Sequence, residues 1–162
     1  MEKELVEAFN EQIKNELYSA YLYLAMAAWA ESENFPGTAH WLKEQAKEEV
    51  EHAMKMFDFL NDRGEKVLLH AIDRPGQDFS SVEDVFENTL AHEQKVTGLI
   101  HRLYELAGKH NDHAAEIFLQ WFVSEQVEEE ATASSILETV RQVKPGSGAL
   151  IVLDRQLGQR KS

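Results

Sequence analysis

Four long segments of this chain repeat apolar residues at alternating steps of three and four, and a glutamate interrupts each repeat near its middle. The segments cover residues 3–33, 37–63, 81–108 and 112–140. Such spacing places the apolar side chains on one face of a helix, where other helices can cover them. A glutamate on that face is unexpected, because a buried carboxylate without a partner costs several kcal/mol. The four glutamates therefore constrain both the fold and the chemistry of the chain.

The apolar face of each segment forms a stripe of residues. In chain order the stripes are Phe9, Ile13, Glu16, Ala20, Tyr23 and Ala27; Leu42, Gln45, Glu49, His52, Met56 and Phe59; Val82, Phe86, Thr89, Glu93, Val96, Ile100 and Leu103; and Ala115, Phe118, Phe122, Glu125 or Gln126, Glu129, Ala133, Ile136 and Val140. No lysine or arginine lies on any stripe. Four unpaired buried carboxylates would cost about as much as the whole stability of a domain, roughly 5–15 kcal/mol. Shared protons could relieve one pair of carboxylates, whereas bound cations could relieve all four.

The breaks between the segments predict how the helices connect. ENFPG at 33–37 and AGKHND at 107–112 are short, so each pair of helices is expected to form an antiparallel hairpin. The seventeen residues 64–80 between the pairs are a long connector. Fully extended they reach about 56 Å, whereas a helix of 27 residues is about 40 Å long. This length fits a crossover between parallel second and third helices.

The prediction is therefore an all-α fold, a four-helix bundle over residues 3–140 within a single domain of residues 1–162. After VKPGSG at 143–148, residues from about 146 to 157 are expected to form a short fifth helix. Their ALIVL stretch also has strand propensity, but an all-helical chain favours the helix.

Composition excludes several classes of function. The formal net charge of −13 speaks against binding to nucleic acid or to anionic membranes and is compatible with cations as ligands. The chain has no cysteine, and hence no disulfide, thiolate metal site or cysteine nucleophile. No stretch is apolar enough to span a membrane, and the N-terminus is too charged for a signal peptide. A cytoplasmic protein is expected.

The polar residues on the stripes match the ligands of a metal site. Glu49 and His52 lie one helical turn apart, and Glu93 and Glu129 are about equally far from the turn between their helices. Glu16 lies roughly six residues farther from its turn than Glu49 does, about 9 Å, which a tilt or a shifted helix end could absorb. Several carboxylates with one imidazole suit Fe or Mn, with Zn as a competitor.

Sequence motifs along nearly the whole chain resemble those of a non-haem ferritin of the bacterial and archaeal type. They are NELYSAYLYL (15–24), AHWLKEQAKEEVEHAMKMF (39–57), HEQKVT (92–97), FLQWFVSEQVEEE (118–130) and LDRQLGQR (153–160). The resemblance implies a ferritin-like bundle with a dinuclear ferroxidase centre that oxidises Fe(II) with O₂. It implies that Glu16, Glu49 and His52 hold the first iron, and that Glu49 bridges to a second iron held by Glu93 and Glu129.

The same resemblance implies roles for further residues around the dinuclear centre. The second Glu-x-x-His of some di-iron bundles is missing, because Thr132 lies three residues after Glu129, and Gln126 is expected close to the second iron. The acids of a nearby third iron site match Glu48, Glu125 and Glu128, for which solvated helix faces are the alternative reading. Tyr23 matches a tyrosine implicated in redox steps, and Trp121 is another aromatic candidate; both could equally be ordinary core aromatics.

Assembly is expected as well. Residues 17–29, LYSAYLYLAMAAW, carry no charge on any face, so the helix should be covered by a subunit partner at Tyr21 and Leu22 among others. The resemblance implies a hollow shell of 24 subunits that stores Fe(III) mineral. Haem is not expected, because Val50 stands where haem-binding relatives carry methionine.

Two other functions remain open at this point. A helical bundle that binds nothing would show no Fe(II)-dependent uptake of O₂. A di-iron or di-manganese enzyme acting on an organic substrate would need an apolar channel to the metals. The other histidines are expected on the surface or in loops; they are His40, His70, His92, His101, His110 and His113.

Overall fold

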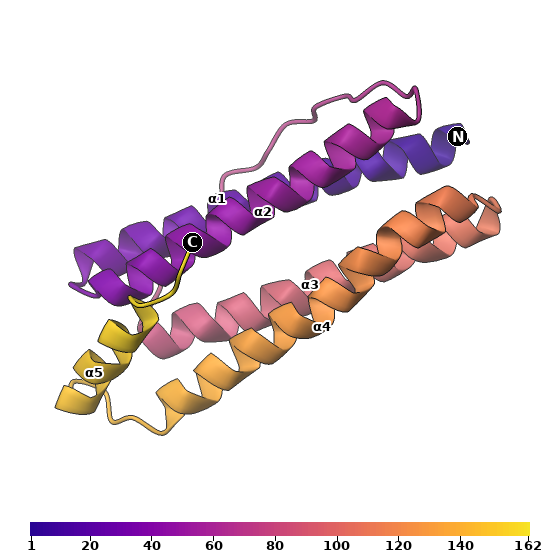
Figure 1. The fold of residues 1–162 in the computed structure, drawn as a ribbon. Coiled ribbons are helices and arrows are strands. Elements are labelled where there is room, and N and C mark those ends of the chain that lie inside the picture. Colours follow the sequence, from indigo (N-terminus) through magenta and orange to yellow (C-terminus); the bar gives the residue numbers. More distant parts are fainter.

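The computed structural model describes all residues 1–162 and contains five helices and no strand. The helices are α1 (Lys3–Ser32), α2 (Pro36–Asp62), α3 (Val82–Lys109), α4 (His113–Arg141) and α5 (Gly148–Leu157). Figure 1 shows α1 to α4 side by side as a bundle, with α5 at one end of it. The predicted all-α class and the short fifth helix are confirmed, and every helix end lies within two residues of its expected place. No helix combines the length and apolarity needed to cross a membrane.

Two asparagines shape the turns within the hairpins. Asn34, between α1 and α2, has a φ of 63°, and Asn111, between α3 and α4, has a φ of 52°. This left-handed conformation ends a helix abruptly, and asparagine tolerates it better than most residues do. Helices α3 and α4 begin at capping side chains. The Ser81 hydroxyl accepts a hydrogen bond from the Asp84 backbone amide, and the Asp112 carboxylate accepts one from the Ala115 backbone amide. Both hairpins are therefore antiparallel, as the short breaks predicted.

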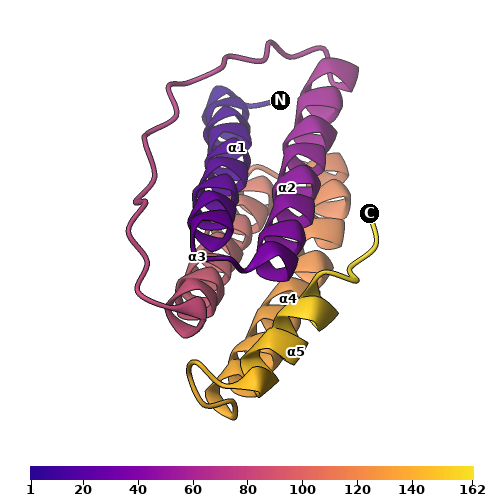
Figure 2. The same ribbon diagram turned by 90° about the vertical axis from the view of Figure 1, so that its left-hand side faces the viewer.

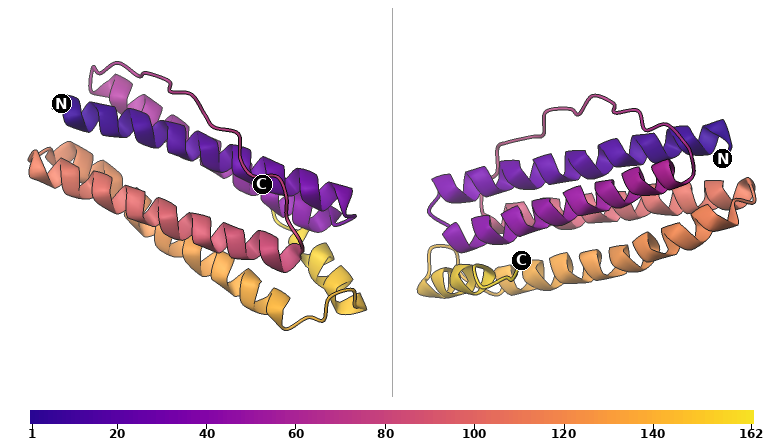
Figure 3. Two further views of the ribbon diagram at one scale, coloured as in Figure 1. Left: turned by 180° about the vertical axis from the view of Figure 1, so that it is seen from behind. Right: turned by 45° about the horizontal axis from the view of Figure 1, so that its top comes forward.

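The long connector between α2 and α3 runs the length of the bundle beside α1 (Figures 2 and 3). Asn10 of α1 holds its first part. The Asn10 amide donates to the Lys66 carbonyl oxygen at 3.4 Å, and the Asn10 oxygen accepts from the Leu68 amide at 3.0 Å. This crossover makes α2 and α3 parallel, which turns all four stripes toward a common interior.

Helix α5 is attached to the N-terminal end of α2. The buried Asp154 carboxylate accepts hydrogen bonds from the Gly37 amide at 3.0 Å, the Thr38 amide at 2.7 Å and the Thr38 hydroxyl at 2.7 Å. Residue 37 has to be glycine, because a Cβ there would lie 1.7 Å from the Asp154 carbonyl oxygen. One side chain of α5 thus supplies the N-terminal hydrogen bonds of another helix.

A polar layer divides the apolar core into two clusters. The cluster of 16 buried residues nearer α5 includes Ala20 and Ala46, and the cluster of 13 residues at the other end includes Ile13 and Ala53. The glutamates of the stripes lie between the two clusters. Phe59, Phe118 and Ile136 of the stripes are only half-buried and pack against these clusters, whereas the next residues along the chain, Leu60, Leu119 and Leu137, are buried.

Candidate metal centre

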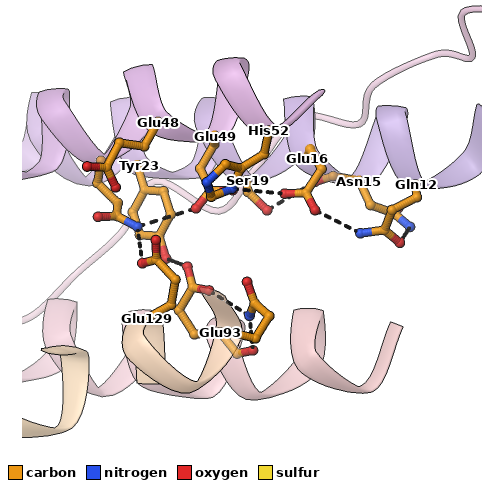
Figure 4. A network of polar contacts seen from close by, with 12 residues as sticks. Gln12, Asn15, Glu16, Ser19, Tyr23, Glu48, Glu49, His52, Glu93 and Glu129 are labelled. Atoms are coloured by element: carbon orange, nitrogen blue, oxygen red, sulfur yellow. Dashed lines mark hydrogen bonds and ion pairs between the residues drawn. The ribbon is translucent and has the colours of Figure 1, made fainter. Parts of the chain in front are cut away.

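The glutamates that interrupt the four stripes meet in the middle of the bundle (Figure 4). Glu16, Glu49, Glu93 and Glu129 are exposed by 1%, 2%, 1% and 7%, and His52 by 4%. Each helix contributes one of these carboxylates, and α2 also contributes the imidazole. The structure thus brings together, in the interior, the five side chains that the stripes singled out.

The half of the centre on α1 and α2 contains the only imidazole. The His52 Nδ1 lies 3.4 Å from Glu49 Oε2 and 4.0 Å from Glu16 Oε2. Glu16 precedes the end of α1 at Ser32 by 16 residues, and His52 follows the start of α2 at Pro36 by 16 residues. Glu16 is therefore level with His52, and its offset from Glu49 is about one turn, roughly 4.5 Å. The predicted offset of about 9 Å was too large, because α1 ends and α2 begins one residue earlier than expected, and both shifts bring Glu16 and Glu49 closer in level.

The other half joins α2 to α3 and α4. One ligand atom each from Glu49, Glu93 and Glu129 can be chosen so that all three lie within 4.8 Å of one another. The α4 stripe left open whether Glu125 or Gln126 faces the interior. Gln126 is the buried residue, and Glu125 is only half-buried. The Gln126 amide donates to Glu93 Oε2 at 3.1 Å and to the Glu93 backbone oxygen at 3.2 Å. Gln126 therefore holds Glu93 in place.

Burial controls the protonation of these carboxylates. Loss of solvation raises the pKa of Glu16 well above its usual range, with a further rise from the charge of Glu49. The pKa of Glu49 is raised well above its usual range by the same loss of solvation, and the charge of Glu93 adds to it. Burial also raises the pKa of Glu93, and it raises the pKa of Glu129 to about 7. Without a cation, these groups tend to keep protons that a bound metal would release.

The donor set fits two adjacent metal ions. Glu16, Glu49 and His52 form one group of potential ligands, and Glu49, Glu93 and Glu129 form a second group. Glu49 belongs to both groups, so its two oxygens can serve two ions. Glu16 Oε2 is buried, makes no hydrogen bond and faces His52 across 4.0 Å. A buried carboxylate oxygen without a hydrogen-bond donor, opposite an imidazole nitrogen, suits the binding of a cation.

Tyr23 lies beside this centre. Its buried hydroxyl donates to Glu93 Oε1. Burial and the charge of Glu93 raise the pKa of Tyr23 well above its usual range, so the phenol keeps its proton and remains a donor. Trp121 lies beside His52, with the two ring centroids 5.4 Å apart, and 40% of its surface is exposed.

Comparison with known proteins places the chain in a family. A family model described as "Ferritin-like domain" matches residues 6–143. The bacterial non-heme ferritin of Staphylococcus saprophyticus is 41% identical over 160 residues, which cover 99% of this chain and 96% of that protein. An open pore ferritin from the hyperthermophilic archaeon Archaeoglobus fulgidus superimposes with a TM-score of 0.98 at 45% identity and 99% coverage of both chains. The chain belongs to the ferritin family. The resemblance noted in the motifs is thereby confirmed.

Of the acids expected at a third iron site in this ferritin, the structure brings two toward the centre. Glu125 lies with His52 and Glu129 in a further group of potential ligands. Glu48 is near enough for its charge to raise the pKa of Glu129, although burial is the main cause of that rise. Glu48 is also paired with Arg160 at 3.0 Å. Glu128 is exposed and belongs to no such group.

Two histidines expected at the surface have internal contacts instead. His92 of α3 is half-buried, and its Nε2 lies 2.7 Å from the Ser19 hydroxyl oxygen. Burial lowers the pKa of His92 to about 4. His40 is half-buried and contacts the backbone oxygen of Arg160 at 2.7 Å. His92 could have been found from its spacing, because it lies three residues after Thr89 and four before Val96 of the same stripe.

Proposed function

We propose that this ferritin stores iron and acts as a ferroxidase, binding two Fe(II) ions per subunit and oxidising them with O₂ before the Fe(III) is retained as mineral. The observation that carries the proposal is the sharing of Glu49 between two groups of buried ligands. Two adjacent ions can deliver two electrons to one O₂, and hard carboxylate oxygens favour Fe(III) over Fe(II), which promotes oxidation.

Each ligand residue has a proposed role. Glu16, Glu49 and His52 bind the first Fe(II), and Glu49, Glu93 and Glu129 bind the second. The hydroxyl of Tyr23 and the amide of Gln126 donate hydrogen bonds to Glu93, and their proposed role is to hold this ligand beside the reacting ions. Glu48, Glu125 and Glu128 are proposed as an accessory site for a third iron. No haem is proposed.

The assembly belongs to the same proposal. Tyr21 is 51% exposed and Leu24 is 47% exposed on the uncharged part of α1, a surface suited to contact with another subunit. A shell of 24 subunits in the cytoplasm, each a single domain of residues 1–162, would enclose the mineral. The archaeal neighbours are described as ferritins with an open pore and with an engineered closed form, which concerns the assembly of those proteins.

The test is anaerobic loading of the iron-free protein with Fe(II), followed by O₂, with absorbance and particle size recorded. We expect rapid oxidation of about two irons per subunit, one for each ligand group, and then retention of many more per particle. Glu49→Ala should abolish the rapid phase, whereas the exposed Glu51→Gln should keep it. Rapid oxidation without retention would contradict storage, and an absent rapid phase would contradict the ferroxidase.

A further inference from the structure

One buried amide joins two carboxylates of the centre, one on α2 and one on α4. The Gln45 Nε2 donates to Glu129 Oε2 at 2.7 Å and to Glu49 Oε1 at 3.3 Å. Gln45 lies one turn before Glu49 on α2 and is exposed by only 2%. Both N–H groups of the amide are thus directed at potential metal ligands, and Gln45 connects α2 to α4 at this level.

The amide can do this in only one of its two orientations. A half-turn about its last bond would point the amide oxygen at the carboxylates, where lone pairs would face one another. Arg160 selects the correct orientation. Its Nη1 donates to Gln45 Oε1 at 2.9 Å, and a guanidinium can donate but not accept. The Gln45 oxygen must therefore face Arg160, and the nitrogen must face Glu49 and Glu129.

Arg160 is itself held firmly, although it lies in the C-terminal tail beyond α5. Its Nη2 pairs with Glu48 Oε1 at 3.0 Å, and its Nη1 also donates to the Trp41 backbone oxygen at 3.1 Å. The guanidinium lies over the Trp41 ring, 4.5 Å from its centroid. The His40 ring contacts the Arg160 backbone oxygen at 2.7 Å. Only 18% of the arginine side chain is exposed, so its position is fixed by several independent contacts.

We infer that Arg160 is a positioning residue for the dinuclear centre, which acts through Gln45 to hold Glu49 and Glu129 in the arrangement that binds metal. The inference rests on the proposed function, because it presumes that these carboxylates are ligands. Hydrogen bonds to ligating carboxylates typically change metal affinity by about 10–100-fold when they are removed. The anchoring of α5 by Asp154 brings the tail to this place, so the C-terminal segment contributes to the centre without touching the metal.

The test measures metal affinity rather than oxidation. The iron-free, full-length protein is titrated anaerobically with Co(II), and bound Co(II) is followed by its visible absorption. Arg160→Ala and Gln45→Leu are each expected to weaken binding at least about tenfold. The matched control is Arg155→Ala, since Arg155 lies on α5, is exposed and forms no ion pair. It should bind Co(II) like the unaltered protein.

Two further variants separate positioning from a general loss of structure. If Arg160 acts through Gln45, the double variant should bind no more weakly than the weaker single variant, because both changes break the same path. Arg160→Lys keeps the charge but lacks the planar fork, so its affinity should lie between those of the unaltered protein and Arg160→Ala. If Arg160→Ala does not assemble, the Co(II) affinity of Arg160→Lys is compared with that of the unaltered protein instead.

Several results would overturn the inference. Equal Co(II) affinity in Arg160→Ala and Arg155→Ala would do so, as would losses that add in the double variant or an affinity of Arg160→Lys no higher than that of Arg160→Ala. Absence of Co(II) binding in the unaltered protein would contradict the proposed metal site itself. The two failures are therefore distinguishable.

Discussion

The buried carboxylates should make the metal-free protein less stable than the same protein with one of them neutralised. Glu129 is the best position to test this, because burial raises its pKa from the ordinary 4.5 to about 7. Glu129→Gln removes the charge, keeps the size of the side chain and leaves an oxygen that can still accept the hydrogen bond from Gln45. We expect this variant to be more stable than the unaltered protein at pH 8 in the absence of metal.

The magnitude follows from the two pKa values of Glu129. Between pH 4.5 and about 7 the folded chain holds a proton that the unfolded chain has lost, so stability falls as the pH rises through this window. Above pH 7 the full penalty is present, about 3 kcal/mol from about 1.4 kcal/mol per pKa unit. For a chain of this length that corresponds to a rise in thermal midpoint of roughly 6–12 °C in Glu129→Gln.

The assay is thermal unfolding of chelator-treated protein at pH 8 and pH 5, at one protein concentration because assembly affects the midpoint. At pH 5 the gain should shrink to less than about 1 kcal/mol, since most of the penalty is absent there. Exposed Glu51→Gln is the matched control and should change neither midpoint. A Glu129→Gln variant that is no more stable than the unaltered protein at pH 8 would refute the reasoning.

Three further changes test other parts of the structure. Tyr23→Phe removes the hydroxyl that donates to Glu93, so Co(II) binding should weaken several-fold while the thermal midpoint changes little; unchanged affinity would contradict this role. Gly37→Ala brings a Cβ to 1.7 Å from the Asp154 carbonyl oxygen, and it should cost at least about 2 kcal/mol by denaturant unfolding as α5 is displaced. Asp112→Ala removes the capping side chain of α4 and its ion pair, with an expected loss of roughly 1–2 kcal/mol measured the same way.

The parts of the fold that sequence predicted depend on residues close together in the chain. Helix positions follow from apolar spacing, and hairpins follow from short breaks at Asn34 and Asn111. The four buried glutamates were found because a carboxylate on an apolar stripe is costly, and four such costs together indicate a cation. The choice between Glu125 and Gln126 could not be made in this way, because both lie at the edge of the same stripe. Only the rotation of α4 in the bundle turns Gln126 inward.

The supporting residues of the centre were beyond the reach of sequence patterns. Arg160 and Gln45 are separated by 115 residues, and no periodicity connects a tail residue to a helix in the first half of the chain. The apolar spacing placed Gln45 on the α2 stripe. Its hydrogen bonds to both Glu49 and Glu129, however, depend on the distance between α2 and α4. The level of Glu16 relative to His52 likewise depends on where α1 ends and α2 begins.

The sequence by itself determined that this protein is a helical bundle with four carboxylates and one imidazole on its inward faces, since burial costs and helical spacing are local properties of the chain. The tertiary structure decided which oxygens approach one another, that Glu49 is shared between two groups of ligands, and that a C-terminal arginine orients the amide between them. Those outcomes depend on helix register and rotation, which are set by packing among segments far apart in the sequence.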